Sequence, residues 1–158
     1  MKKILIALDY APTSIQVAEQ GFSLAKAMNA EVTLLHVVSD DSYYYAGEAS
    51  PVMGFSGFSS VDFTQFINTD GLTKAAEYFL QKIKHHLGDD NIETIIERGN
   101  FADVILEKAK HLKADVIVMG SHSRRWYEKI LIGSVTEEVL DETKTPLFIV
   151  PTKEHHLK

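Results

Sequence analysis

Residues 3–9 read Lys-Ile-Leu-Ile-Ala-Leu-Asp, so five apolar side chains follow one another before the first acidic one. A strand with one face in water alternates apolar and polar residues, whereas a strand covered by helices on both faces is apolar at consecutive positions. The second pattern recurs at residues 32–38, 115–119 and 146–150. A fifth stretch, residues 93–97, carries charges at both ends and is expected nearer a sheet edge.

Segments with helical spacing lie between these strands. The first helix is expected to open at Pro12, the second to end at Gly88, the third to follow Asn100 as its N-cap and the fourth to follow Gly133. The expected inward faces are Ile15, Ala18, Phe22, Ala25 and Met28 in the first helix, Leu72, Ala76, Phe79, Ile83 and Leu87 in the second, Ile105, Ala109 and Leu112 in the third, and Val135, Val139 and Leu140 in the fourth.

The alternation of strands and helices predicts an α/β fold with a single open, parallel, five-stranded sheet flanked by helices. We expect one domain over residues 1–152 and a charged C-terminal tail at 153–158. Residues 39–68 interrupt the pattern with glycines, paired serines and three consecutive tyrosines. Such a long insert either covers a ligand or partner through its tyrosines, or is a mobile segment with some aromatic anchoring to the body.

Composition excludes several classes of protein. The chain has 158 residues, no cysteine, 22 acidic and 16 basic side chains, and a formal net charge of -6. The negative charge argues against sequence-independent binding of nucleic acid, because such binding depends on a basic surface. The apolar run at residues 4–8 is too short for a signal peptide, and no stretch has the roughly 20 apolar residues that a bilayer requires. We therefore expect a soluble, cytoplasmic protein.

The most informative stretch runs from Met119 to Val135. A glycine leaves a buried strand, a polar loop follows, and Gly133-Ser134 opens a helix. The N-terminus of a helix presents unpaired backbone N–H groups and the positive end of the helix dipole, and both favour an anion such as phosphate. Alternatively, Ser134 and Glu137 form a capping box that only starts the helix. Neither the P-loop pattern nor the dinucleotide Gly-x-Gly-x-x-Gly pattern is present.

This stretch resembles the nucleotide loop of the universal stress protein family, which has glycine, two residues, glycine, nine residues, and glycine followed by serine or threonine. Gly120, Ser123 and Gly133-Ser134 stand at those spacings. Ser123 replaces the second glycine. Its Cβ restricts close approach of the backbone to phosphate, whereas its hydroxyl can donate to a phosphate oxygen. The resemblance extends to residues 3–9, 34–38, 97–100 and 145–150.

The resemblance implies a Rossmann-like fold that binds ATP or AMP, with Mg²⁺ accompanying the phosphates, and a homodimer formed through the C-terminal strand from Pro146 to Val150. Two further loop residues, His122 and Arg124, are candidates for phosphate contact, although a solvated role is the plain alternative for both. The implied site comprises Ala7 and Asp9 beside adenine or ribose, the main chain of Val37 at the adenine edge, Met119 and Gly120 at the ribose and first phosphate, and backbone groups of Ser123, Gly133, Ser134 and Val135 at the phosphates.

The leading hypothesis is therefore a nucleotide-binding stress-response protein that acts as a sensor or regulatory module. Because the chain has no cysteine and no Gly-x-Ser-x-Gly elbow, we expect no dedicated catalytic residue and at most slow ATP hydrolysis. No dedicated metal site is expected, and His36 is interpreted as a hydrogen-bonded histidine of the core or crevice. The alternative is a dimeric stress protein that binds no nucleotide and works through protein–protein contacts.

Overall fold

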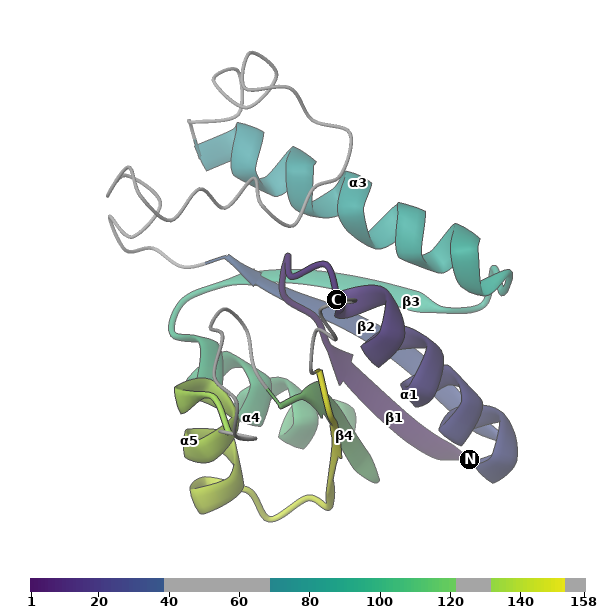
Figure 1. The fold of residues 1–158 in the computed structure, drawn as a ribbon, viewed down its shortest axis with the longest axis vertical. Coiled ribbons are helices and arrows are strands. Elements are labelled where there is room, and N and C mark those ends of the chain that lie inside the picture. Colours follow the sequence, from purple (N-terminus) through teal and green to yellow (C-terminus); the bar gives the residue numbers. More distant parts are fainter. Residues whose placement is uncertain (39–68, 122–131, 153–158) are drawn as a thin grey trace, which may run out of the picture.

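The computed structural model describes residues 1–38, 69–121 and 132–152 (Figure 1). The expected insert at 39–68 and the expected tail at 153–158 lie outside the described residues. The elements, in chain order, are β1 (Lys2–Ala7), α1 (Ser14–Met28), β2 (Ala30–Val38), α3 (Thr69–Leu87), β3 (Glu93–Arg98), α4 (Phe101–Leu112), β4 (Val116–Gly120), α5 (Ser134–Glu142) and β5 (Leu147–Val150).

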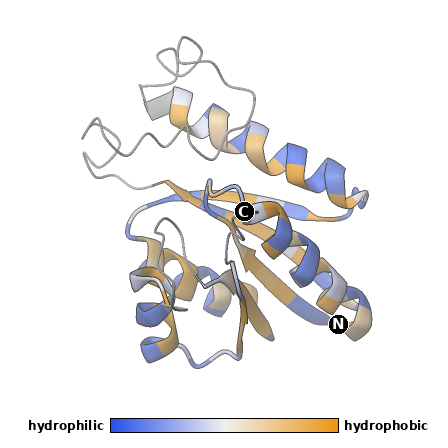
Figure 2. Ribbon diagram, viewed as in Figure 1, coloured by the Kyte–Doolittle hydropathy of each residue, from blue (hydrophilic) through white to orange (hydrophobic). Residues whose placement is uncertain are grey.

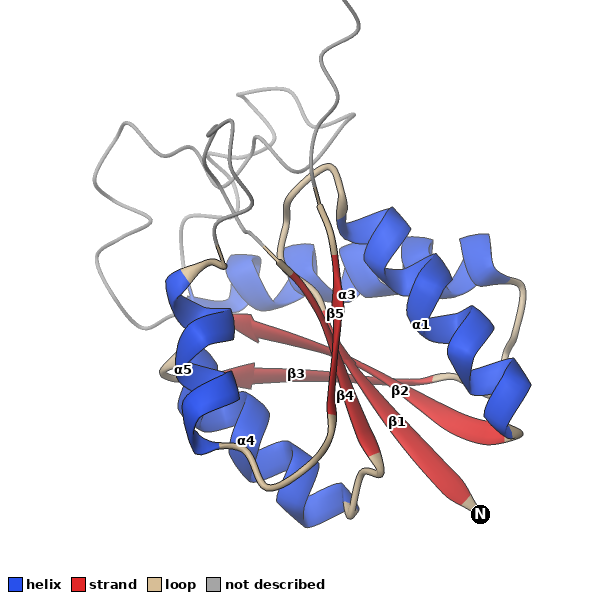
Figure 3. Cartoon of the chain, turned by 60° about the horizontal axis from the view of Figure 1, so that its bottom comes forward, coloured by secondary structure: helices blue, strands red, loops and turns tan. Residues whose placement is uncertain are grey.

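The five strands form one sheet in the order β3-β2-β1-β4-β5, and every neighbouring pair is parallel. Helices α1 and α3 cover one face of the sheet, and α4 and α5 cover the other (Figure 3). The predicted α/β class with a parallel five-stranded sheet is confirmed. The charged strand β3 lies at an edge, as predicted from its sequence.

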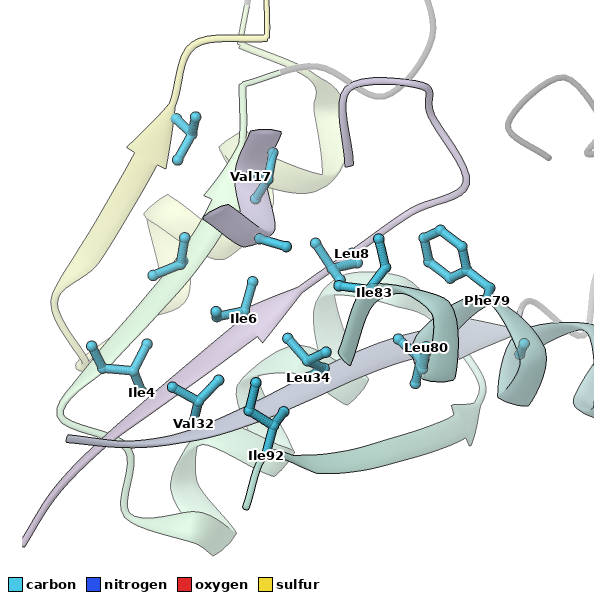
Figure 4. Close-up of a cluster of buried hydrophobic side chains, with 14 of the residues drawn as sticks. Ile4, Ile6, Leu8, Val17, Val32, Leu34, Phe79, Leu80, Ile83 and Ile92 are labelled. Carbon is cyan, nitrogen blue, oxygen red and sulfur yellow. The ribbon is translucent and has the colours of Figure 1, made fainter. Parts of the chain in front are cut away.

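Each face of the sheet has its own apolar core, because successive side chains of a strand point to opposite faces. In β1, Ile4 and Ile6 pack against α1 and α3, whereas Leu5 joins the core under α4 and α5. All three side chains are at most 1% exposed. Figure 4 shows the first core, and Figure 2 shows that apolar residues predominate in the central strands. The consecutive apolar residues of the sequence therefore supply two cores at once.

Two predicted inward positions, Ile15 and Leu140, are wrong. Ile15 is 43% exposed while Ser14 is buried, and Leu140 is 46% exposed while Val139 is fully buried. Successive helical residues are about 100° apart, so the neighbour of a fully buried residue turns away from a narrow buried face. The start of α1 is also two residues later than predicted, at Ser14, so Pro12 precedes the helix.

Two predicted helix ends are confirmed. The Asn100 side chain accepts a hydrogen bond from the Asp103 N–H at 3.1 Å and caps α4. Gly88 follows α3 with a φ of 72°, a left-handed conformation that glycine adopts at little cost. Asn100 therefore begins α4 through its side-chain hydrogen bond, and Gly88 ends α3 through its left-handed backbone.

Replacing Gly21 with valine tests the close packing of α1 on the sheet. A Cβ at Gly21 would lie 2.6 Å from Ile6 Cδ1 and 3.1 Å from Val118 Cγ1, and both neighbours are fully buried. We expect Gly21→Val to lower the free energy of unfolding by roughly 1–3 kcal/mol, measured by chemical denaturation. The matched control is Ser23→Val at an exposed position of the same helix. Equal losses in the two variants would contradict the packing argument.

Candidate functional site

The candidate site lies at the carboxyl edge of the sheet, between β1 and β4. The chain runs from β1 outward to β2 and β3 and then returns to β4 on the other side of β1, so strand order reverses between β1 and β4. Ligands of open α/β sheets bind at such a reversal, beyond the carboxyl ends of the strands. Ile6 is level with Val118 in the register of the two strands. Ala7 and Met119, one residue further along, therefore reach the same edge.

Asp9 follows β1 and shapes the turn into α1. Its Oδ1 accepts a hydrogen bond from the Ala11 N–H at 2.9 Å, a contact two residues along the chain. This is the local turn role that aspartate commonly has. The carboxylate thus organises the backbone at the mouth of the crevice, and a contact with ligand stays a prediction.

The main chain of Val37 is directed to the side of β2 on which β1 has already ended. Gly99 N–H donates to Val38 O, so the even-numbered residues of β2 bond toward β3 and the odd-numbered ones toward β1. On the β1 side, the last rung runs from Leu8 N–H to Leu35 O at 2.9 Å, because β1 ends at Ala7. Among the described residues, no group continues this ladder to Val37. Its N–H and C=O therefore point into the space that β1 leaves.

His36 lies beside Val37 but points into the core, where it is 2% exposed. Its Nδ1 lies 2.8 Å from the Leu8 carbonyl oxygen. The rings of Tyr10 and Phe79 pack against the imidazole, with centroids 4.1 and 5.7 Å away. Burial lowers the pKa of His36 to about 4, although the bond to Leu8 opposes that shift. The imidazole is therefore neutral at pH 7.

The expectation that His36 is fully hydrogen-bonded is wrong for one of its two nitrogens. A carbonyl only accepts, so Nδ1 carries the proton and donates to Leu8. Nε2 is then a buried acceptor, and it has no hydrogen-bond partner in the described structure. Sequence reasoning missed this because His36 follows a run of apolar strand residues and resembles an ordinary core position.

The N-terminus of α5 lies at the carboxyl end of β4. The Gly133 N–H donates to Ser121 O at 2.7 Å, and the Thr136 hydroxyl donates to Gly120 O at 3.0 Å. The Gly133 amide thus closes the base of the loop, so phosphate contact by that N–H is not available in this arrangement. Ser134 and Val135 are the first helical residues, whose N–H groups have no acceptor within a helix.

The capping-box alternative for Ser134 is wrong. The N-cap of α5 is Gly133, which has no side chain, so Ser134 does not occupy the N-cap position that a capping box requires. Ser134 is instead the first helical residue and is exposed. Its hydroxyl is therefore not used to start the helix.

Gly120 has a packing role that the sequence did not indicate. A Cβ there would lie 2.9 Å from Thr152 Cγ2 and 3.1 Å from Val17 Cγ2. Thr152 is buried after β5, and its N–H donates to the Ser121 hydroxyl at 3.0 Å. Thr152, which follows β5, thus packs against Gly120 and Ser121 at the end of β4. Thr136 and Thr152 were missed because their partners are backbone and side-chain groups from other elements.

Three predicted site residues, His122, Ser123 and Arg124, lie outside the described residues. Within residues 1–38, 69–121 and 132–152, no group of three or more histidine, cysteine, aspartate or glutamate side chains is placed to hold a metal ion. In the same part of the chain, no helix combines the length and apolar character needed to cross a bilayer.

Comparison with known proteins gives consistent results. The sequence model of the universal stress protein family matches residues 1–151. The universal stress protein MJ0577 of Methanocaldococcus jannaschii is 31% identical over 156 residues, which cover 96% of each chain. A solved structure of MJ0577 is similar with a TM-score of 0.73 at 28% identity, over 98% of each chain. A universal stress protein solved in complex with cAMP shares the fold, with a TM-score of 0.59 at 20% identity over 96% of this chain and 98% of that one.

The burial of neutral His36 predicts that stability falls in mild acid. Because the pKa is lowered in the folded state from 6.5 to about 4, the unfolded chain takes up the proton first. The stabilising difference is fully present above pH 6.5 and is lost as the pH falls from about 6.5 to about 4, by up to about 3 kcal/mol. Urea denaturation across this range should show a smaller fall for His36→Leu. The exposed His111 gives the control, since His111→Leu should follow the unmodified protein.

Proposed function

Because the chain belongs to the universal stress protein family, we propose that it binds an adenine nucleotide, ATP or AMP, and acts as a cytoplasmic sensor or regulatory module in the stress response. The observation that carries this proposal is the main chain of Val37, whose N–H and C=O are directed beyond the end of β1, the strand beside which strand order reverses. Binding at this place would use groups that the sheet itself leaves without partners.

The base is proposed to lie against Val37. Adenine offers an amino donor and a ring-nitrogen acceptor on adjacent positions of one edge, which match a backbone C=O and N–H. Guanine has the reverse order, an oxygen acceptor and a ring N–H donor, and would leave two buried polar groups facing like groups. Unsatisfied buried groups cost about 1–3 kcal/mol each, so this edge favours adenine. A relative of the same fold was solved with cAMP, which also contains adenine. Ala7 and Asp9 would then border the base or ribose.

The phosphates are proposed to lie at the start of α5. Amides of Ser134 and Val135 and the Ser134 hydroxyl would receive phosphate oxygens, with the helix dipole adding to the attraction. Met119 and Gly120 would border the ribose and the first phosphate. Ser123, His122 and Arg124 are proposed to contact the phosphates from the loop, with Mg²⁺ accompanying ATP. We propose binding as the function, with hydrolysis of ATP slow at most.

Gly133→Val and Ser134→Ala test the phosphate contacts. A ligand present at 100 times its dissociation constant adds about 2.7 kcal/mol to the folded state, which raises the thermal midpoint. We expect such a shift with millimolar ATP and Mg²⁺ in the unmodified protein and a smaller one in Ser134→Ala. We expect none in Gly133→Val, because the added side chain would fill the space proposed for the phosphates beside the Ser134 and Val135 amides. Gly133 has φ -62° and ψ 155°, so valine fits the backbone there and the variant should fold. Tight binding by a folded Gly133→Val protein would rule out the phosphate assignment.

A second candidate function is a dimer that binds partners without nucleotide. It is favoured by the open edge of the sheet at β5, where Phe148 is 37% exposed. Ser123, at the position of the family's second glycine, is the residue that would prevent nucleotide binding in this case. No thermal shift with ATP in the unmodified protein, followed by a shift in Ser123→Gly, would support this candidate.

Both candidates include a homodimer through Pro146 to Val150, and Ile149→Pro tests it. Ile117 and Ser121 N–H groups donate to Pro146 and Val150 O, so even-numbered residues of β5 bond to β4 and odd-numbered ones face outward. Proline at 149 removes an outward N–H and leaves the ladder to β4 intact. Sedimentation velocity should show a monomer for Ile149→Pro and a dimer for Ile149→Ala. A dimeric proline variant would place the interface elsewhere.

A further inference from the structure

We infer that His36 is a positioning residue of the nucleotide site: its imidazole holds the Leu8 carbonyl and so keeps the Val37 main chain available to the base. The claim that Val37 stays available to the base, the ligand half of this inference, rests on the proposed function. The claim that His36 holds the Leu8 carbonyl, the structural half, concerns the protein without ligand and is tested separately.

The geometry of the ladder carries the first step. If the parallel ladder of β1 and β2 continued beyond the Leu8 N–H to Leu35 O bond, its next rung would join Val37 N–H to Leu8 O. That carbonyl instead receives the His36 Nδ1–H at 2.8 Å. The His36 side chain thus occupies Leu8 O, the acceptor that the N–H of its neighbour Val37 would use. The strand β1 parts from β2 at this point, and the crevice opens.

The surroundings of the imidazole carry the second step. The tilted Tyr10 ring and the Phe79 edge fix the orientation of the His36 ring, and Tyr10 follows directly on the Leu8-Asp9 turn. Tyr10 and Phe79 also contact each other, with centroids 5.2 Å apart. One cluster therefore holds the turn after β1, α3 and the carboxyl end of β2 in a single arrangement. Asp9 and the Val37 main chain keep a fixed relation to each other because of it.

The cost of the arrangement indicates that packing alone does not account for it. Nε2 of His36 is a buried acceptor without a partner in the described structure. The positions around it belong to the apolar core. An apolar side chain of similar size would avoid that penalty. Local departures from the most stable choice concentrate at functional sites. The donor on Nδ1 is the part of histidine that leucine lacks, and it acts on Leu8.

His36→Leu removes the donor, and His36→Asn retains one, because the asparagine side-chain amide can stand near the position of Nδ1–H. In the protein without ligand, the Val37 amide hydrogen of His36→Leu should exchange with solvent at least about tenfold more slowly than in the unmodified protein, because Leu8 O becomes available to it. His36→Asn should exchange like the unmodified protein. His111→Leu, at an exposed position of α4, is the matched control.

Binding measured by calorimetry gives the second readout, with ATP and inorganic tripolyphosphate as probes. We expect His36→Leu to weaken ATP binding roughly tenfold, the loss of about one hydrogen bond, and to leave tripolyphosphate binding unchanged. His36→Asn should restore ATP affinity. Equal weakening of both probes would indicate a merely structural role and overturn the inference.

The two halves fail in different ways. An unmodified protein that binds neither probe overturns the proposed function and the ligand half with it, and the exchange data still decide the structural half. Should His36→Leu not fold, the unmodified protein provides the test, because its Val37 amide should exchange faster than the Leu35 amide, which lies within the ladder. Equal protection of the two amides would overturn the inference.

Discussion

A strand in a parallel sheet bonds alternately to its two neighbours, so a strand that ends early removes the partners of every second residue beside it. In this chain β1 ends at Ala7 while β2 continues to Val38. For that reason the Val37 main chain has no partner in β1, the strand beside which strand order reverses. The position of the candidate site therefore follows from where β1 ends beside the longer β2, and the His36 side chain acts on the backbone at that end.

Much of the architecture could be predicted from local patterns. Consecutive apolar residues identified buried parallel strands, and Asn100 and Gly88 marked helix ends through the chemistry of a single residue. Ile15 and Leu140 were misplaced because an apolar residue beside a buried one fits a helical pattern nearly as well, and only the neighbouring elements decide between them. The chain alone does not say where two strands part, so the role of the Val37 main chain at the adenine edge was implied only by family resemblance.

The site also separates groups with local roles from groups that a ligand would use. Asp9 bonds to Ala11 and Gly120 packs against Thr152, so each has a structural reason to be present. Among the described residues, the Ser134 and Val135 amides have no such partner, because the first N–H groups of a helix find no acceptor within it. Recognition through amides requires no lysine or arginine. A net charge of -6 is therefore compatible with an anionic ligand.

The bond between Gly133 N–H and Ser121 O has a consequence for how this scaffold tolerates change. This bond joins the described residues on either side of positions 122–131, and lengthening a closed loop adds little entropic cost, about 0.6 kcal/mol for each doubling. A change in the length of that segment would therefore add little closure entropy between the ends of β4 and α5. Descendants of one ancestral chain can in this way gain or lose a ligand while they keep the same fold.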